Sequence, residues 1–520
     1  MISESSERKI GTILSYASIG VGIIVSLLYT PYMLKTVGKA EFGLYNTLVS
    51  MIGMISMIEL GFTSSYIKFY AKYEHDHDEK ALATFNSLFT IIFLIIGLIS
   101  LCIGVFFTFH LDLVYKNGLT SREYDEAKTM LLLMTISLAL GFITTVFTSF
   151  ISAKEKFIFL KSFGLATSVL TVALNIICLM GGHGVVGLVF ITFIVGVFSK
   201  IVYILYAFKA VKIHFDLNLK NIKLSLLKEI LSFSGLIAIN IFVDKINSSI
   251  DSVLLGRFCG TAVVGVYAVG MSISNMNTNF STAISGIFTP RVHKLVNEYK
   301  MDSIEQRQSL TSFFTRIGRV QFILMALIAS GYVFFGKRFI YLWAGPGYDE
   351  SYYVALMLIV PNIVPLIQNV GIEIQRAESR HHYRSYIYGV MAVINLVLTI
   401  FLCQRWGAIG AAFGTFLSIL IANIIIMNIV YHKKINIDMF VFWKSIISLC
   451  RGIIIPIVIG ILINKYAIKD CGILWFGVWV IVYSVIYLAS MWLFGMNEYE
   501  KNVFKSFINS LKNRGKVKAR

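Results

Sequence analysis

Long apolar stretches, separated by short polar segments, recur along the whole 520-residue chain. Each is about twenty residues long, which is the length that an α-helix needs to cross the hydrocarbon core of a bilayer. A backbone in lipid must satisfy its hydrogen bonds internally, and stretches of this length do so as helices rather than as barrel strands. The pattern predicts fourteen membrane-spanning helices, near residues 10–34, 42–67, 83–108, 129–151, 158–180, 184–207, 229–254, 262–289, 317–341, 352–374, 385–403, 407–430, 446–464 and 472–495.

An internal repeat organises these helices. Shifting the chain by 222 to 223 residues aligns FGLY (42–45) with VGVY (264–267), and GVVGLVFITF (184–193) with GAIGAAFGTF (407–416). Six predicted helices separate the copies, so both copies start on the same side of the membrane and are parallel repeats. A duplicated bundle of this kind is typical of transporters in which one half rocks against the other.

We therefore expect an all-α, polytopic membrane protein with three parts. Residues 1–225 and 226–440 are predicted to form two six-helix bundles, and residues 441–520 to add two helices and a basic tail. The composition agrees with this class, because 57% of the residues are hydrophobic and only 14% are charged.

The basic residues predict which side of the membrane each loop faces. Of the 46 Lys and Arg residues, 33 fall on the face that carries both termini and 11 on the other face, while Lys200 and Lys245 lie within predicted helices. The positive-inside rule places the richer face, and both termini, in the cytoplasm. The same distribution accounts for the net charge of +18, so we expect contacts with anionic membrane lipids and none with nucleic acid.

The sequence does not favour an enzyme. The longest predicted outer connection covers only about residues 109–128, which leaves little room for catalytic groups, and no GxxxxGK[ST] phosphate loop is present. The six cysteines are scattered, and the charged run YEHDHDEK (73–80) is interpreted as a solvated cytoplasmic loop. We expect no catalytic residues, no cofactor and no metal site.

The seventh predicted helix carries an unusual set of polar residues. Asn240, Asp244, Asn247 and Asp251 are spaced by four, three and four residues and so share one helical face. An ionised side chain in the bilayer costs roughly 2.5 to 3.5 kcal/mol, so such a face is expected to line a cavity. Alternatively, the two acids and Lys245 neutralise one another as a structural cluster, and Asp251, near the outer end, is interfacial.

Two neighbouring segments carry further candidates. In the eighth helix, Asn275, Asn279 and Thr282 form a polar row that suits sugar hydroxyls, or hydrogen bonds between helices. In the second helix, Glu59 of MIELGF lies midway through the apolar run. It is either a proton or cation relay or the partner of a lysine on another helix.

The tenth predicted helix contains Pro361 and Pro365, followed by Asn369, Glu373 and Arg376. Proline opens a helix locally, so this segment is either a moving gate or a static kink with an ion pair near the membrane surface. Cations at the cytoplasmic ends of the helices are candidates for an anion-attracting vestibule: Lys68, Arg291, Arg319, Arg376 and Arg384.

Several segments together resemble a known family. GKAEFGLYN after the first helix, MIELGF, DSVLLGRFCGTAVVGVYAVG and TPRVHKL are similar to those of the polysaccharide flippases, the Wzx-type transporters of O-antigen and capsule repeat units. Their superfamily also holds the multidrug and toxin extrusion (MATE) proteins and the lipid II flippases. The resemblance implies a MATE-like bundle in the bacterial inner membrane, and translocation of an undecaprenyl-diphosphate-linked oligosaccharide by alternating access.

The same resemblance implies roles for the polar residues. A diphosphate needs cations and a sugar needs hydrogen-bonding groups, while proton or sodium antiport supplies energy. Other glycan-assembly proteins are candidate partners. The candidates are, for the diphosphate, Lys245, Arg291 and Arg376; for the sugar, Asn275, Asn279 and Thr282; and for the coupling ion, Glu59, Asp244 and Glu373.

Three other functions stay open at this point. A cation-coupled drug exporter of the same superfamily would use Glu59 and Asp244 as its main site, but twelve helices are typical of that class. Lipid II flippases usually carry arginines in the first helix, and residues 10–34 contain none. A glycan polymerase would need a catalytic outer loop.

Overall fold

The computed structural model describes residues 4–75, 78–115, 119–216, 224–468 and 471–506. Within helices, the side chains of residues 4–5, 8–9, 224–226, 236, 239–240, 244 and 247–248 are outside this description. The described chain is built from helices and contains no strand, which confirms the prediction of an all-α fold.

The chain forms two compact units, which are described separately. The N-terminal unit comprises Met1–Val269 with Tyr388–Thr415, and the C-terminal unit comprises Gly270–Ile387 with Phe416–Arg520. The boundaries fall inside two helices. The domains predicted from the repeat, at 1–225, 226–440 and 441–520, stay a prediction.

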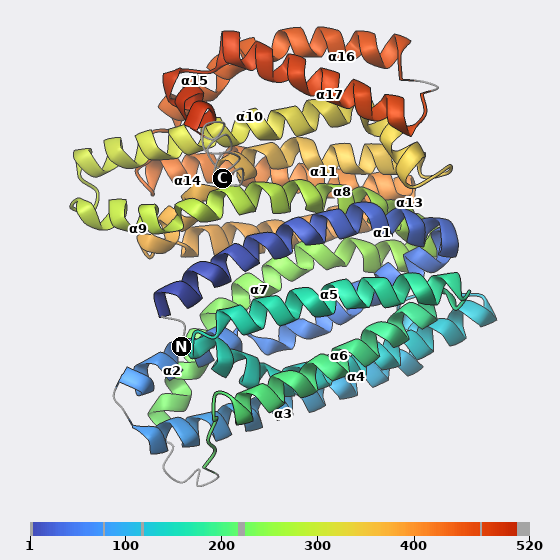
Figure 1. Cartoon of the computed structure of the whole chain (residues 1–520), viewed down its shortest axis with the longest axis vertical. Coiled ribbons are helices and arrows are strands. Elements are labelled where there is room, and N and C mark those ends of the chain that lie inside the picture. The colour runs from blue at the N-terminus through green and yellow to red at the C-terminus, as the bar shows by residue number, and fades with distance from the viewer. Residues whose placement is uncertain (1–3, 76–77, 116–118, 217–223, 469–470, 507–520) are drawn as a thin grey trace, which may run out of the picture. The chain divides into compact units, whose positions relative to one another are not determined.

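The N-terminal unit contains the first seven α-helices and parts of two others. Its elements are α1 (Glu4–Ile55), the 3-10 helices η1 (Ser56–Glu59) and η2 (Leu111–Leu113), α2 (Phe62–His75), α3 (Glu79–Phe109), α4 (Ser121–Ala153), α5 (Phe157–Met180), α6 (Gly184–Lys209), α7 (Leu224–Phe258), the start of α8 (Thr261–Ser285) and part of α13 (His382–Ile419). Helices α3, α4 and α6 lie side by side (Figure 1).

The C-terminal unit holds the rest of α8 and α13 and the remaining helices. These are η4 (Gly286–Phe288), α9 (Thr289–Glu298), α10 (Ile304–Trp343), α11 (Asp349–Ile367), α12 (Asn369–Ala377), a π-helical stretch (Leu420–Ile426), α14 (Met427–Lys433), α15 (Met439–Leu449), η6 (Cys450–Ile453), α16 (Ile454–Tyr466), α17 (Ile473–Ser490) and a second π-helical stretch (Met491–Gly495). Helices α15, α16 and α17 pack against α10 (Figure 1).

Ten described helices are long and apolar enough to cross a membrane. Two of them, Ile10–His75 and His382–Lys433, are far longer than one crossing requires. Each is interrupted by a non-helical glycine, Gly38 (φ 77°) and Gly407 (φ 54°) respectively. The seventh and eighth predicted spans coincide with α7 and α8, which lie outside the ten. The total of fourteen spans stays a prediction.

The repeat is visible in one close contact within the N-terminal unit. Gly43 of FGLY and Gly265 of VGVY occupy matching repeat positions. A Cβ added at Gly43 would lie 1.7 Å from the carbonyl oxygen of Thr261, and one added at Gly265 would lie 2.4 Å from that of Lys39. Each carbonyl belongs to the residue four positions before the opposite glycine. Helices α1 and α8 therefore approach backbone to backbone at equivalent points, which only glycine permits.

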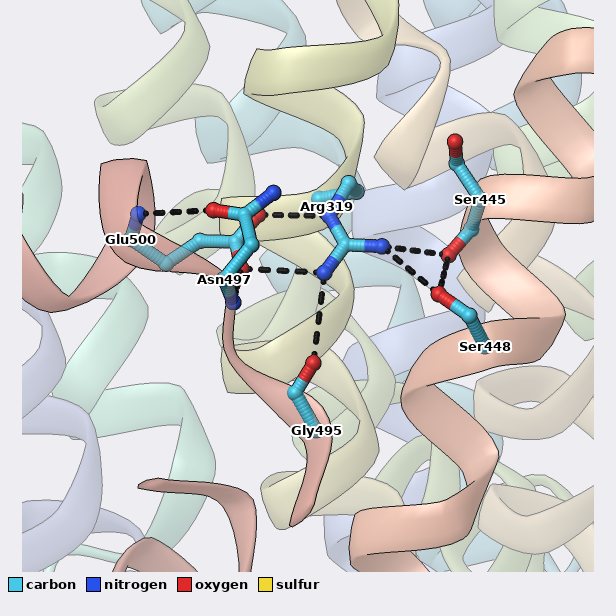
Figure 2. A network of polar contacts seen from close by, with 6 residues as sticks. All are labelled: Arg319, Ser445, Ser448, Gly495, Asn497 and Glu500. Carbon is cyan, nitrogen blue, oxygen red and sulfur yellow. Dashed lines mark hydrogen bonds and ion pairs between the residues drawn. The ribbon is translucent and has the colours of Figure 1, made fainter. Parts of the chain in front are cut away.

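A buried ion pair connects the last part of the chain to α10. The guanidinium of Arg319 donates to both carboxylate oxygens of Glu500, at 2.5 and 3.0 Å, and both side chains are almost fully buried (Figure 2). The remaining guanidinium donors reach the Ser445 carbonyl at 2.6 Å, the Ser448 hydroxyl at 2.9 Å and the Gly495 carbonyl at 3.3 Å. This cation is therefore enclosed and neutralised. It is not available as an open vestibule residue.

The glycine contact predicts an asymmetry between two substitutions in α1. Gly43→Ala forces a methyl group into a backbone carbonyl, and we expect it to lower the free energy of unfolding by about 2 kcal/mol or more. Gly22→Ala is the control, because a Cβ there meets nothing within 4 Å. It should be neutral or stabilising by up to about 1 kcal/mol. Denaturant unfolding in detergent measures both, and equal stability of the two variants would contradict the contact.

The Arg319–Glu500 pair predicts that removing one of the two charges lowers the free energy of unfolding more than replacing both. Glu500→Gln leaves a buried guanidinium without its counter-charge, which should cost about 3 kcal/mol or more in unfolding free energy. The double variant Arg319→Met with Glu500→Leu should recover part of that loss. Glu498→Gln, an exposed neighbour, serves as the control. A double variant less stable than Glu500→Gln alone would argue against this prediction.

Candidate functional site

A cavity of about 510 Å³ lies within the N-terminal unit, between α1, η1, α4 and α6. Most of its wall is apolar, as expected inside a helix bundle. Its polar groups are one carboxyl, one phenol and four aliphatic hydroxyls, from Glu59, Tyr45, Ser56, Ser137, Thr145 and Thr192. These groups line a space large enough for several waters or for part of a ligand. The hydroxyls of Ser56, Thr145 and Thr192 donate to backbone carbonyls three or four residues before them and can still accept a hydrogen bond.

Glu59 stands where the helix is interrupted. It ends η1, and the next two residues, Leu60 (φ 49°) and Gly61 (φ 74°), turn the chain into the start of α2. Its Oε1 accepts the backbone N–H of Thr63 at 3.3 Å, one of the free donors at the beginning of α2. Gly61 is required twice over, by its positive φ and because a Cβ would lie 2.6 Å from Ile237. The sequence IELGF thus places an acid at a helix break beside a cavity.

A lysine adjoins the same cavity from α6. Lys200 Nζ donates to the Ser137 hydroxyl at 3.2 Å. Gly141 and Gly196 leave room for it, since a Cβ at Gly196 would lie 3.4 Å from Nζ. The position of Lys200 within a predicted helix was evident from the sequence, but its contact with Ser137 was not. In the described part of the chain, Glu59 has no ion-pair partner, so the pairing with a lysine considered above is not observed.

A second polar cluster surrounds Asp251 in the same unit. Its carboxylate, 1% exposed, accepts hydrogen bonds from Tyr267 at 2.6 Å, Thr415 at 2.9 Å and Thr399 at 3.3 Å. Asn395 bonds to both threonines. Asp251 is therefore buried inside the protein, and its interfacial position stays a prediction.

The Asp251 cluster lacks a positive charge. Among the described residues no Lys, Arg or His forms an ion pair with this carboxylate. Burying a carboxylate without a counter-charge is costly, and the three hydrogen bonds offset part of that cost. Besides the carboxylate of Asp251, the other four side chains of the cluster also carry oxygen atoms. Oxygen atoms are the ligands that a hard cation prefers.

The turn at Gly407 builds this cluster. Thr399 and Thr415 lie at equal distances in sequence on either side of it, and a Cβ at Gly414 would lie 3.0 Å from Thr399 Oγ1. The chain reverses at the glycine, so both hydroxyls reach one carboxylate. The signal in the sequence was GAIGAAFGTF, a glycine-rich segment with one threonine, but its partner in α7 was not evident without the fold.

The other candidates of α7 and α8 fall into separate environments. Lys245 is half-buried on α7, and the side chain of Asp244 is outside the described residues. Asn275, Asn279 and Thr282 are exposed on α8, and the Thr282 hydroxyl donates within its own helix to the carbonyls of Thr278 and Asn279 at 3.1 Å.

A polar residue of α8 that the sequence did not single out is more enclosed. Asn277 is buried in the C-terminal unit, and neither its amide nitrogen nor its oxygen has a hydrogen-bond partner in the described structure. Such a side chain is expected to bind water or a polar ligand group. It lies between Asn275 and Asn279 in the sequence but faces inward.

The cations predicted for a diphosphate also differ from one another. Arg376 donates to Glu373 at 2.8 Å on α12, which is the ion pair near the membrane surface that the sequence allowed as an alternative. Arg291 is exposed on α9. The diphosphate and ion-coupling roles of these residues stay predictions.

A charged cluster follows α12 in the C-terminal unit. Arg380 donates to both oxygens of Asp302, at 2.9 and 2.5 Å, and to the Lys434 carbonyl at 2.8 Å. Glu378 lies 3.6 Å from the same guanidinium, and its two oxygens are buried without hydrogen bonds. Burial raises the pKa of Glu378 to about 7, against the lowering effect of Arg380, while the hydrogen bonds from Arg380 lower the pKa of Asp302.

The sequence matches known proteins over most of its length. A model of the family described as "Polysaccharide biosynthesis protein" matches residues 10–296, more than half of the chain. The "Putative O-antigen transporter" of Shigella flexneri is 19% identical over 402 residues, 73% of this chain and 87% of that protein. The "Probable flippase AglR" of Haloferax volcanii is 27% identical over 181 residues, 34% of this chain and only 37% of that protein.

Solved structures share the fold. A structure titled "Lipid II flippase MurJ, inward closed conformation" aligns with a TM-score of 0.66 at 15% identity, covering 93% of this chain and 98% of that one. An inward-facing "multidrug resistance MATE family transporter of the MOP superfamily" aligns with a TM-score of 0.55 at 14% identity, covering 78% and 96%. At these identities the likeness shows the fold alone, and it agrees with the expected MATE-like bundle.

Glu378 predicts a pH-dependent stability. Its carboxyl is protonated in the folded state up to about pH 7, whereas in the unfolded state it ionises near pH 4.5. Protonation of Glu378 therefore favours the folded state, so the contribution of this group to stability is fully present below about pH 4.5 and is lost as the pH rises to about 7. We expect this group to account for about 1–2 kcal/mol across the window after solvent screening.

The measurement compares unfolding midpoints between about pH 5 and pH 7.5. Glu378→Gln should flatten the decline, while Glu305→Gln, an exposed carboxyl in the same unit, should leave it unchanged. The pKa of Asp302 is lowered, so its titration lies below this window. An identical slope in wild type and Glu378→Gln would show that Glu378 is not the titrating group.

Proposed function

Since the chain belongs to the polysaccharide biosynthesis protein family, we propose that it is a flippase for an undecaprenyl-diphosphate-linked oligosaccharide. It would move an O-antigen, capsule or exopolysaccharide repeat unit from the cytoplasmic to the outer leaflet by alternating access. We further propose that it works as a multi-pass protein of the cytoplasmic membrane with both termini inside, and that a proton or sodium ion drives the cycle.

The observation that carries this proposal is the cavity beside Glu59. A transporter of a sugar headgroup needs hydrogen-bonding groups inside an otherwise apolar bundle, and the cavity supplies a carboxyl and hydroxyls there. The names of the two relatives, a flippase and an O-antigen transporter, support the same substrate class. We propose a carrier and not an enzyme, because the names of both relatives describe carriers.

Ion coupling is proposed at two acidic residues of the N-terminal unit, Asp251 and Glu59. Asp251 is buried among neutral groups, and Glu59 adjoins a cavity. Release of a proton or cation from either site leaves a charge whose cost must be met by a change in its surroundings. This is the property that couples ion movement to a conformational cycle. Asp244 and Glu373 are weaker candidates here, the latter because it is paired with Arg376.

The residues proposed to contact the substrate are the cations and polar side chains that the sequence indicated, taken one by one. Lys245 and Arg291 remain candidates for the diphosphate, and Asn275, Asn279 and Thr282 for the sugar. Arg376 would first have to leave Glu373. Charge-assisted hydrogen bonds would replace the water that the diphosphate loses on leaving the membrane surface.

A cation-coupled drug exporter is the second candidate, because the MATE transporters share the fold. For that function the acids Glu59 and Asp251 would form the main site, and Lys245 would have no clear use. A lipid II flippase is the third candidate, favoured by the fold of MurJ but not by the first predicted helix, which lacks arginine.

Reconstitution into liposomes tests the proposal. A fluorescent undecaprenyl-diphosphate oligosaccharide is followed between leaflets with and without an imposed proton or sodium gradient. We expect a gradient-stimulated rate in wild type, and a loss of about tenfold or more in Asp251→Asn and Glu59→Gln, since moving one charge across 100 mV is worth about 2.3 kcal/mol. Glu298→Gln, exposed on α9, should keep the wild-type rate.

Two outcomes would overturn parts of this proposal. Full activity in Lys245→Ala, Glu59→Gln and Asp251→Asn would remove the proposed sites. No glycolipid transfer, together with gradient-driven efflux of a cationic dye, would support the exporter instead.

A further inference from the structure

A second cavity, of about 610 Å³, lies in the N-terminal unit between α2 and the beginning of α7. Its charged groups are Lys68 and Lys72 from α2, and Lys228 and Glu229 from α7. An aromatic ring, Phe233, forms part of its wall. We call it the α2–α7 lysine pocket. It is separate from the cavity beside Glu59, with which it shares no lining residue.

Tight packing beneath this pocket holds its two helices together. The hydroxyls of Ser65 and Ser234, both buried, lie 2.6 Å apart. Gly61 lets α7 approach closely, because a Cβ there would meet Ile237 at 2.6 Å. The pocket is therefore preformed, and a ligand does not have to assemble it.

The pocket carries a net positive charge from converging side chains. Lys68 Nζ lies 3.8 Å from the centre of the Phe233 ring, which holds the ammonium in place by a cation–π contact. Lys72 and Lys228 are exposed, and neither has an ion pair or hydrogen bond with any residue that the structure describes. The single acid of the wall, Glu229, offsets only one of three positive charges.

Among the described residues, no acid outside the pocket forms an ion pair with these lysines. Glu74, one turn beyond Tyr70 on α2, is paired with Lys154 at 2.6 Å. The pocket thus offers three ammonium groups to a ligand of about two negative charges, with the Ser232 hydroxyl as a further donor. A lipid-linked diphosphate carries about two negative charges and a phosphodiester headgroup about one, and the phosphate oxygens of both accept such hydrogen bonds.

The position of the pocket indicates the source of the ligand. It lies where the second predicted span ends and the seventh begins, both at the face predicted to be cytoplasmic. Lipid phosphates lie at this depth, and the cytoplasmic leaflet is the one in which the proposed substrate is made. Scattered basic residues are expected at this face, but three lysines around one preformed hollow with an aromatic wall are a more specific arrangement.

We propose that the α2–α7 lysine pocket binds the phosphate headgroup of a lipid in the cytoplasmic leaflet. The headgroup is either the diphosphate of the lipid-linked substrate, captured before it enters the transport path, or the phosphate of an anionic phospholipid that supports the protein. The first source rests on the proposed function, and the second does not.

Native mass spectrometry of the full chain in neutral detergent tests the pocket with two probes, farnesyl diphosphate and a short-chain phosphatidylglycerol, and with farnesol as the ligand without phosphate. The variant is Lys68→Gln, Lys72→Gln, Lys228→Gln. The control, Lys161→Gln, Lys294→Gln, Lys300→Gln, removes three exposed lysines from the same predicted face outside the pocket.

We expect the pocket variant to raise the dissociation constant of one phosphate probe by about tenfold or more, and the control variant by less than about twofold. A loss confined to farnesyl diphosphate assigns the pocket to the substrate. A loss confined to phosphatidylglycerol assigns it to a phospholipid. Unchanged binding of both probes, equal losses in the control, or no phosphate-dependent binding in wild type would each overturn the proposal.

Two precautions keep the test decisive. If the triple variant does not fold, Lys72→Gln with Lys228→Gln avoids Lys68, whose ammonium packs on Phe233. The readout is binding and not transport, so the outcome is independent of the liposome assay. A wild type that binds farnesyl diphosphate in this pocket but transports no glycolipid would refute the proposed function and leave the pocket standing.

Discussion

A charge inside an apolar helix bundle is stable only where neighbouring groups replace the water that it has lost. The described structure meets this condition in three ways. Arg319 and Glu500 neutralise each other within a closed set of hydrogen bonds (Figure 2). Asp251 receives hydrogen bonds from hydroxyls that carry no charge. Glu59 adjoins an open cavity.

These three arrangements have different consequences for a working cycle. The charges and hydrogen bonds of the Arg319–Glu500 pair are satisfied by residues of the protein itself. The pair therefore links the segment around Glu500 to α10 and requires no ligand. The carboxylates of Asp251 and Glu59 have no ion-pair partner among the described residues, and under the proposed function a proton, a cation or a ligand would supply the missing charge or contacts. Both of these acids lie in the N-terminal unit.

Features that depend on local spacing could be predicted from the sequence. The helices follow from the length of the apolar runs, and the ion pair of Glu373 with Arg376 follows from its three-residue separation. The position of Glu59 within an apolar segment was visible in the sequence, although the cavity beside it was not. The matching glycines were visible in the repeat alignment, although their contact was not.

Features that join distant segments could not be predicted in this way. Glu500 is 181 residues from Arg319, and each of them alone looks like an ordinary residue near a membrane surface. The hydroxyls around Asp251 come from α8 and from both sides of the turn at Gly407, so they could not be predicted from the sequence of α7. The lysine pocket likewise needs α2 beside α7 before its three charges form one site.

The contact between Gly43 and Gly265 constrains the same position in both repeats. After a duplication, the two copies could otherwise change independently. Here each glycine accommodates a carbonyl of the other repeat, so a larger residue in either repeat would collide with the backbone of the other. At this crossing the two halves cannot diverge independently, and both positions must remain glycine for as long as the helices meet there.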